Sequence, residues 1–246
     1  MLCVSLALVG LLLVRRLVSL QVRESANAVT GITFGATYVL YGITLAFSLY
    51  IGNQEFSDAR ETVEREAGSL EETFELAGQL PQPERARVQD LVESYAREVV
   101  EEEWPMMAEG AESQRADLLI DELQRSVAGF KPDTSAEQTL YSQRLTAVSV
   151  VEAEREIRLL HSSQNTHALL WYILVAGGVI TVLHSFFFGT KAVWLQALSV
   201  AALTTVVVLI LTATYQIQDP FGGSVRVEPE AFEEVLDEIQ RHRLEG

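Results

Sequence analysis

Long apolar stretches constrain this chain more than any other feature. Residues 30–51 run for 22 positions without a charged side chain, and about 20 apolar residues suffice for a helix to cross the hydrocarbon core of a bilayer. Residues 168–188 and 194–215 are equally free of Asp, Glu, Lys and Arg. Aromatic residues such as Trp171 and Trp194 stand near their ends, as is typical of membrane interfaces. We therefore expect a transmembrane helix in each of the three stretches.

The N-terminal stretch is less regular. Residues 1–14 are apolar but short for a full crossing, and Arg15 and Arg16 interrupt the run before it continues to residue 20. A signal peptide is one alternative, but the first residues carry no positive side chain and no small-residue cleavage site follows. We favour a short or tilted span over residues 1–20, whose arginines reach toward the interface.

The short link at residues 189–191 predicts that the last two stretches form an antiparallel hairpin. The expected fold class is an all-α membrane protein, with four transmembrane helices in two pairs and an inserted helical-bundle soluble domain. Its expected parts are residues 1–52 as membrane pair 1 (spans about 1–20 and 30–51), residues 53–166 as an acidic helical soluble domain, residues 167–216 as a membrane hairpin (spans about 168–188 and 194–215), and residues 217–246 as a tail with a turn and an amphipathic helix.

Charge is concentrated in the middle of the chain. Residues 53–166 hold 25 of the 34 acidic residues and 11 of the 18 basic ones, so this segment carries a net charge of −14. A strongly acidic surface repels phosphate, which argues against nucleic acid as a partner. The only cysteine, Cys3, excludes an internal disulfide and a thiolate metal site.

The acidic segment has the period of helices and no strand-type alternation. Apolar residues recur every three or four positions after residue 57, which predicts one amphipathic helix that continues the second stretch. Pro81 and Pro83 end it, and residues 134–137 form a capping box for a later helix. After residue 229 the tail has a further apolar stripe, which we expect to dock on the bundle or on a neighbouring subunit. The residues of the first stripe are Ala59, Val63, Ala67, Leu70, Phe74 and Ala77.

A search for chemistry finds no catalytic or metal-binding motif. Residues 101–103 are three consecutive glutamates, which we interpret as a solvated helix face because the whole segment is acidic. The three long apolar stretches contain no carboxylate or arginine, which ion-coupled transporters generally need. We therefore predict that the protein is not an enzyme, uses no cofactor, holds no metal, and carries out no active transport.

The second apolar stretch carries a stripe of hydroxyl and aromatic side chains at spacings of 4, 3, 4, 3 and 4. Glycines lie beside the stripe, and two of them have the spacing that lets helices approach closely. Because unsatisfied hydroxyls are costly in hydrocarbon, the stripe must meet protein or water. It is either a packing face whose hydroxyls bond to backbone carbonyls, or a pore lining. The stripe comprises Thr30, Phe34, Thr37, Tyr41, Thr44 and Ser48, and the glycines are Gly31, Gly35 and Gly42.

Four segments together carry a resemblance to a known family: residues 40–47, residues 59–67, residues 95–106 with their Glu-Trp-Pro-Met end, and the turn Asp219–Gly223. In this combination the chain resembles the bacterial bestrophin-like family over most of its length. That family is similar in plan to bestrophins, which are pentameric anion channels with four spans, a helical cytosolic body and a pore lined by the second span. The resemblance implies that the stripe lines a pore, and that a turn anchors the tail at the membrane edge. The residues of that turn are Asp219, Pro220, Phe221 and Gly222.

One segment departs from the pattern of bestrophins, which carry asparagine and arginine after the second span. Residues 53–65 are acidic here, and an acidic vestibule repels anions, so the resemblance does not extend to anion selectivity. The side of the membrane is also open. The resemblance favours the soluble domain inside the cell, whereas the positive-inside rule weakly favours it outside. This use of the rule includes Arg155 and Arg158, which the sequence places near a membrane end of the soluble domain.

The leading hypothesis is an oligomeric passive ion channel of bestrophin-like architecture, with the second stretch lining the pore. The alternative is a non-conducting membrane scaffold or sensor, whose acidic helical domain binds a partner. We expect lipid and inorganic ions as partners, and a homo-oligomer that is a pentamer by resemblance. The predicted spans place the protein in the plasma membrane of a prokaryote, as a multi-pass protein. Because 16 of the 18 basic residues are arginine and acidic residues are in excess, that prokaryote is expected to be GC-rich or salt-adapted.

Overall fold

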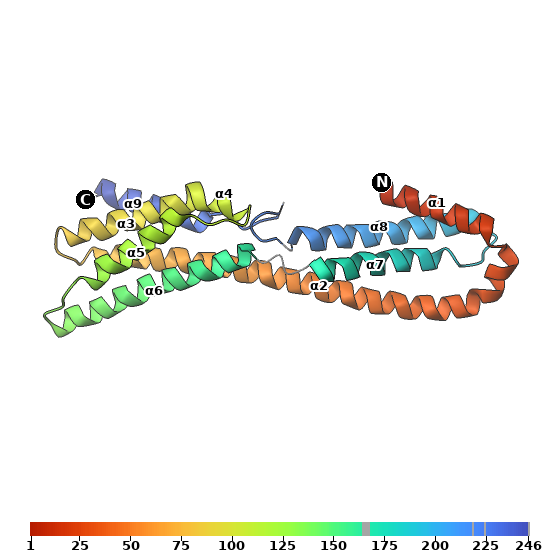
Figure 1. Cartoon of the computed structure of the whole chain (residues 1–246), viewed down its shortest axis with the longest axis horizontal. Coiled ribbons are helices and arrows are strands. Elements are labelled where there is room, and N and C mark those ends of the chain that lie inside the picture. Colours follow the sequence, from red (N-terminus) through yellow and green to blue (C-terminus); the bar gives the residue numbers. More distant parts are fainter. Residues whose placement is uncertain (164–167, 218, 224, 246) are drawn as a thin grey trace. The chain divides into compact units, whose positions relative to one another are not determined.

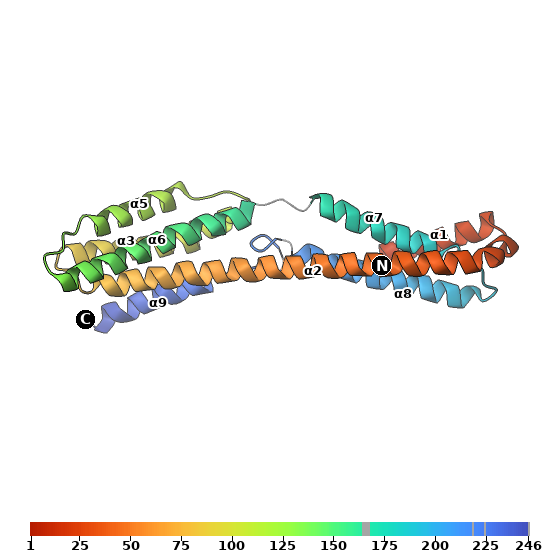
Figure 2. The same cartoon turned by 90° about the horizontal axis from the view of Figure 1, so that it is seen from below.

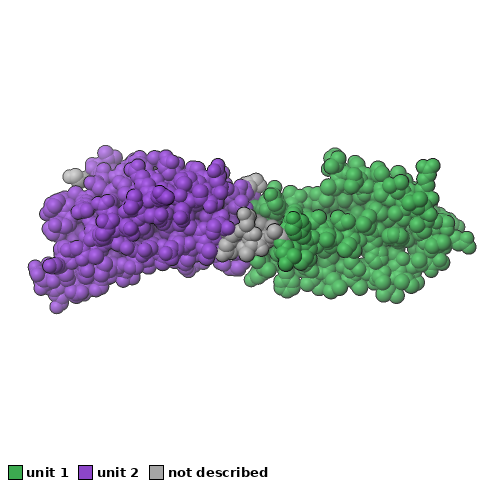
Figure 3. Space-filling model, viewed as in Figure 1, with its two compact units in different colours: residues 1–53, 165–218 green, residues 54–164, 219–246 purple. Residues whose placement is uncertain are grey.

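The computed structural model describes residues 1–163, 168–217, 219–223 and 225–245, and every regular element within these ranges is a helix (Figures 1 and 2). The chain divides into two compact units. Unit 1 comprises residues 1–53 and 165–218, and unit 2 comprises residues 54–164 and 219–246 (Figure 3). The tail therefore belongs to the same unit as the acidic segment. The predicted boundary between residues 166 and 167 lies outside the described residues.

Unit 1 is built from four apolar helical segments: α1 (Leu2–Leu17), the first part of α2 (Leu20–Ala77), α7 (Ala168–Ser185) and α8 (Val193–Ile217). Among the described residues, α2 and α8 are long and apolar enough to cross a membrane, and α7 contains a shorter apolar helix. Two candidate spans follow from length and composition. The arrangement of four spans in two pairs stays a prediction.

The helices of unit 1 pack through two small apolar clusters. Ala7 and Leu11 of α1 meet Val200 of α8, together with Phe186 just after α7. The second cluster joins α2 to α7 and α8. Most other apolar side chains of this unit point outward and are exposed in the single chain, as expected for a protein surrounded by lipid or by further subunits. The second cluster consists of Tyr41, Leu45, Leu174 and Val207.

The loop between α7 and α8 is fixed to the start of α2 by its backbone. Asn27 accepts a hydrogen bond from the Gly189 N–H (2.8 Å) and donates one to the Gly189 carbonyl (2.9 Å). A Cβ at position 189 would lie 2.3 Å from the Glu24 nitrogen, so only glycine fits this contact. Arg15 of α1 also reaches the loop, where it donates to Gln196 and to the Thr190 carbonyl (3.3 Å).

Unit 2 is a helical bundle. It contains the second part of α2, α3 (Glu84–Glu98), a π-helical turn η1 (Val99–Glu103), α4 (Trp104–Met107), α5 (Gln114–Ala128), α6 (Ser135–Ser163) and α9 (Glu230–Glu245). The predicted amphipathic stripe of α2 is buried in its core, as are the apolar positions of α3 and α5. The predicted continuation of the second stretch is confirmed, because α2 is one helix from residue 20 to residue 77.

The predicted turn chemistry and tail docking are also present in unit 2. At the start of α6, Glu137 Oε2 accepts from the Thr134 N–H, and Thr134 Oγ1 accepts from the Glu137 N–H, both at 3.2 Å. This is the reciprocal arrangement of a capping box. Helix α9 buries Phe232 and Ile239 in the bundle, and Arg243 pairs with Asp90 at 2.7 Å. The tail thus docks on its own bundle.

Candidate functional site

The predicted stripe of α2 faces the interior of its own subunit. Thr30, Tyr41 and Ser48 are buried, and Phe34, Thr37 and Thr44 are half-buried. The Thr44 hydroxyl donates to the Leu40 carbonyl and the Ser48 hydroxyl to the Thr44 carbonyl, both at 2.9 Å. The arrangement within one chain is therefore that of a packing face, in which backbone carbonyls accept the hydroxyl protons.

Tyr41 has the most specific contact of this stripe. Its hydroxyl donates to the Leu174 carbonyl of α7 at 3.0 Å. The ring lies against Gly177 and Gly178, where an added Cβ would come within 2.7 Å and 2.8 Å of tyrosine atoms. The two consecutive glycines thus form a notch in α7 that receives the ring and holds α2 against the hairpin.

The opposite face of α2 has no partner within the described chain. At 3.6 residues per turn, positions 32, 39, 43 and 50 lie across the helix from Tyr41. Their side chains, Ile32, Val39, Ile43 and Tyr50, are all exposed, Ile43 by 50%. Between the two faces lie Gly31, Gly35 and Gly42, and a Cβ built on any of them would meet no atom within 4 Å. A close helix contact at these glycines would therefore have to come from another molecule.

The turn after α8 is folded by its own aspartate and enters the core of unit 2. Asp219 Oδ1 accepts from the Gly222 N–H (2.7 Å) and the Phe221 N–H (3.3 Å). Phe221 is buried, with its ring edge-on to Trp104 at 5.6 Å, and the Trp104 indole donates to the Val227 carbonyl at 3.3 Å. The Glu-Trp-Pro and Asp-Pro-Phe-Gly motifs of the sequence are thus in contact with each other.

A buried network of charges occupies the centre of unit 2. Arg158 of α6 is fully buried; its guanidinium donates to both oxygens of Glu66 (2.7 and 3.0 Å) and to Glu103 (2.8 Å). Arg155, one turn earlier, donates to Glu103 at 2.6 Å and also pairs with Asp117. The Arg158 guanidinium also lies over the Trp104 ring, 5.5 Å from its centroid. Two arginines and two glutamates therefore neutralise each other inside the core.

The network holds its members in fixed ionisation states. Burial alone would raise the pKa of Glu103, but Arg158 and Arg155 keep the pKa below its ordinary value. Burial, followed by the nearby charge of Glu66, raises the pKa of Tyr95 well above its ordinary value, and the Tyr95 hydroxyl donates to Glu66 at 2.6 Å. Such a network, fully hydrogen-bonded, fixes the relative positions of α2, α3, η1 and α6.

Two interpretations of the sequence are wrong at this network. The solvated face predicted for residues 101–103 holds for Glu101 and Glu102, which are exposed, but not for Glu103, which is 0% exposed because the π-helical turn rotates it into the core. Arg155 and Arg158 were counted as membrane-flanking charges, but both are buried in ion pairs, so they give no information on orientation. The sequence spacing could have predicted the burial of these arginines, because they lie on the same helical face as the apolar residues of α6. The residues of this face are Arg144, Val148, Val151, Arg155 and Arg158.

Within the described residues, no group of three or more His, Cys, Asp and Glu side chains is placed to hold a metal ion. The ionisable groups of the network are all paired with each other, and nothing in it resembles a nucleophile beside a base. What distinguishes the molecule is therefore the long apolar helix α2, with one face packed and one face free.

Comparisons with known proteins agree with this architecture. The family described as Bestrophin-like domain matches residues 1–232. Among solved structures, a variant of a bacterial bestrophin homologue from Klebsiella pneumoniae superposes with a TM-score of 0.64 at 12% sequence identity, covering 87% of this chain and 85% of that chain. At this identity the likeness concerns the fold. No curated protein matches the chain.

Proposed function

We propose a function from one premise, that this chain belongs to the bestrophin-like family: it forms an oligomeric, passive ion channel in a membrane. Bestrophins are channels rather than enzymes, which makes ion conduction the expectation for a member of this family. Four spans in two pairs, a pentameric ring and a bacterial plasma membrane are parts of the same proposal. The single observation that carries the proposal is the free apolar face of α2.

The free face matters because of how a pore forms at a symmetry axis. A helix that lines such a pore must turn toward the axis a face that its own subunit leaves open. The hydroxyl stripe is closed by α7 and α8, whereas Ile32, Val39 and Ile43 are exposed. We therefore move the proposed pore lining from the predicted stripe to this opposite face. The stripe residues Phe34, Thr37 and Thr44, which are half-buried, lie on the packed side of α2 with Tyr41.

The chemistry of the proposed lining sets how it conducts. A ring of valine and isoleucine side chains offers no charge and no strong dipole, so a narrow section would act as a hydrophobic gate that conducts only when it is wetted. The charge-free run of residues 30–51 also supplies no proton-carrying group, which fits passive conduction rather than ion-coupled transport.

The test is ion flux through liposomes that contain the purified full-length protein, under gradients of several monovalent salts. We expect salt-dependent flux that Ile43→Trp strongly reduces, because five bulky rings would fill the axis. A matched control is Leu209→Trp on α8, whose side chain is exposed and lies across α8 from Val207, the residue that packs on Tyr41. Flux that is absent under every gradient would overturn the channel proposal and leave the non-conducting scaffold in its place.

A further inference from the structure

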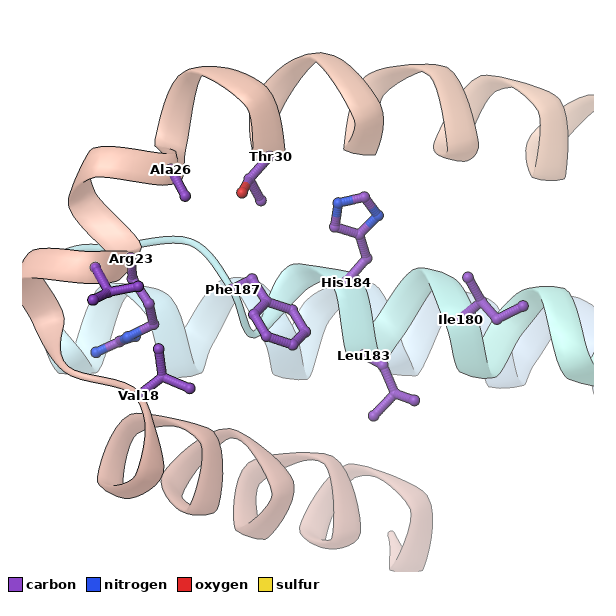
Figure 4. A pocket seen from close by; sticks show the side chains of 9 residues that line it. Val18, Arg23, Ala26, Thr30, Ile180, Leu183, His184 and Phe187 are labelled. Atoms are coloured by element: carbon purple, nitrogen blue, oxygen red, sulfur yellow. The ribbon is translucent and has the colours of Figure 1, made fainter.

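A pocket in unit 1 opens where α1 passes into α2, beside the end of α7. Figure 4 shows Ala26 and Thr30 of α2 on one side, Leu183 and His184 of α7 with Phe187 just after it on the other, and Val18 and Arg23 at the elbow. Its volume is about 530 Å³, and almost all of its lining surface is apolar. Several of its walls, including Val22, Leu183 and Phe187, are also exposed on the outside of the unit. The pocket is therefore accessible to lipid.

Arg23 is the one lining residue that carries a fixed charge. It is only 3% exposed, and among the described residues the one hydrogen bond of its guanidinium group runs from a terminal nitrogen to the Phe188 carbonyl at 3.3 Å. Its Nε is buried without a hydrogen-bond partner. Within the described residues no carboxylate forms an ion pair with Arg23. A buried cation that lacks both a counter-ion and part of its hydrogen bonding is unfavourable, so an anion would be bound favourably there.

The depth of Arg23 suits a lipid headgroup. It lies seven residues before Thr30, where the predicted span of α2 begins, which is about 10 Å along the helix at 1.5 Å per residue. The positive charge of Arg15 also acts on this position, and Glu24 offsets it only in part. A cation at the edge of the hydrocarbon, next to an apolar pocket open to lipid, is complementary to an anionic headgroup with an attached acyl chain.

We propose that this pocket binds an anionic phospholipid, with the phosphate on Arg23 and the start of an acyl chain along Val22, Leu183 and Phe187. The bound lipid would join α1, α2 and α7, and so stabilise the elbow from which α2 runs toward the proposed pore. The inference rests on the membrane location in the proposed function, but it does not require conduction. A protein that binds the lipid and passes no ions would overturn only the channel.

The test measures lipid retention by native mass spectrometry and the midpoint of thermal unfolding, for the full-length protein in detergent with added phosphatidylglycerol or phosphatidylcholine. We expect phosphatidylglycerol to be retained at one per subunit and to raise the midpoint, with phosphatidylcholine retained at least tenfold less. Arg23→Gln should abolish this preference. The control is Arg16→Gln, which removes the same charge from an exposed neighbour that does not line the pocket.

A second variant keeps the proposal testable if Arg23→Gln fails to fold. Ala26→Phe fills the pocket and leaves Arg23 in place, so it should reduce retention of phosphatidylglycerol while the oligomeric mass is unchanged. Equal retention of both lipids by the unmodified protein, or an equal loss of preference in Arg16→Gln, would overturn the proposal. Stabilisation by inorganic phosphate alone, equal to that by phosphatidylglycerol, would replace the lipid with a free anion.

Discussion

At the scale of single residues, the buried arginines of the two units differ in their hydrogen-bond and ion-pair partners. Arg155 and Arg158 are fully supplied with carboxylate partners, whereas Arg23 has one carbonyl and an unpartnered Nε. A buried ion network adds little stability compared with a well-packed apolar core, but breaking one partner is costly because the other charge remains buried. The paired arginines thus act as fixed structural links, and the unpaired one belongs to the proposed lipid site.

The central role of Arg158 leads to a stability prediction. Arg158→Met leaves the buried Glu66 without its charged partner and leaves Glu103 with Arg155 alone, so it should destabilise the protein by about 3–5 kcal/mol. The exposed pair of Arg60 with Glu64 is the control, since Arg60→Gln should cost less than about 1 kcal/mol. Thermal unfolding of the full-length protein, followed by circular dichroism, compares the two. Equal unfolding midpoints of Arg158→Met and Arg60→Gln would mean that the buried network does not stabilise the fold.

The lowered pKa of Glu103 predicts acid sensitivity. A carboxyl group whose pKa is lower in the folded state stabilises the fold above its ordinary value of 4.5, and this stabilisation is lost as pH falls through the folded-state pKa. We therefore expect the midpoint temperature of unfolding to decrease once the pH falls below about 4. Glu103→Gln should lower the midpoint at neutral pH and flatten this acid limb. An acid limb that is as steep in the variant as in the unmodified protein would contradict the assignment.

At the scale of elements, α2 is a single helix with different tasks along its length and around its circumference. The 3.6-residue period predicted that the stripe from Thr30 to Ser48 lies on one face, and predicted the buried stripe from Ala59 to Ala77 in the same helix. It did not tell which face of the apolar part packs within the subunit, because both faces are free of charge. That choice is made by Tyr41 and the Gly177–Gly178 notch, which are 136 residues or more apart in sequence.

The buried network shows a second limit of sequence reasoning. Charged residues on an apolar stripe, such as Arg155 and Arg158 on α6, are visible in the spacing, but their partners lie on α2 and at the π-helical turn. A π turn shifts the register of the following residues, so the usual helical projection places Glu103 on the wrong side. Helix positions and the capping box were predictable, since they depend on neighbours in sequence.

The notch in α7 makes a prediction about this element. Gly178→Leu would push its side chain against the Tyr41 hydroxyl and Val207 Cγ1, which lie 2.8 Å and 3.0 Å from an added Cβ. We expect destabilisation by about 1–3 kcal/mol, typical of an overpacked contact. Gly68→Leu in the exposed part of α2 is the matched control, because no atom lies within 4 Å of its added Cβ. Unfolding midpoints in detergent measure both, and equal values would show that the notch is not a specific contact.

At the scale of the whole molecule, the proposed assembly places the free face of α2 and its glycines against further subunits. Gly35 and Gly42 meet no atom of their own chain, so a substitution there should spare the fold of the subunit and weaken the assembly. We expect Gly35→Leu to lower the oligomeric mass in nanodiscs, measured by native mass spectrometry, with the unfolding midpoint of unit 2 unchanged. An oligomeric mass that Gly35→Leu leaves unchanged would place the subunit contacts elsewhere.

The central claim is that the free face of α2 lines an ion-conducting axis. The most direct test is the single-channel current of Ile43→Cys in a planar bilayer, before and after a charged methanethiosulfonate reagent. The exposed Cys3 is first replaced by serine, so that the introduced cysteine is the only target. We predict a current that the reagent blocks or changes stepwise, with Leu209→Cys unaffected. A current that modification of position 43 leaves unchanged, or no current at all, would contradict the account.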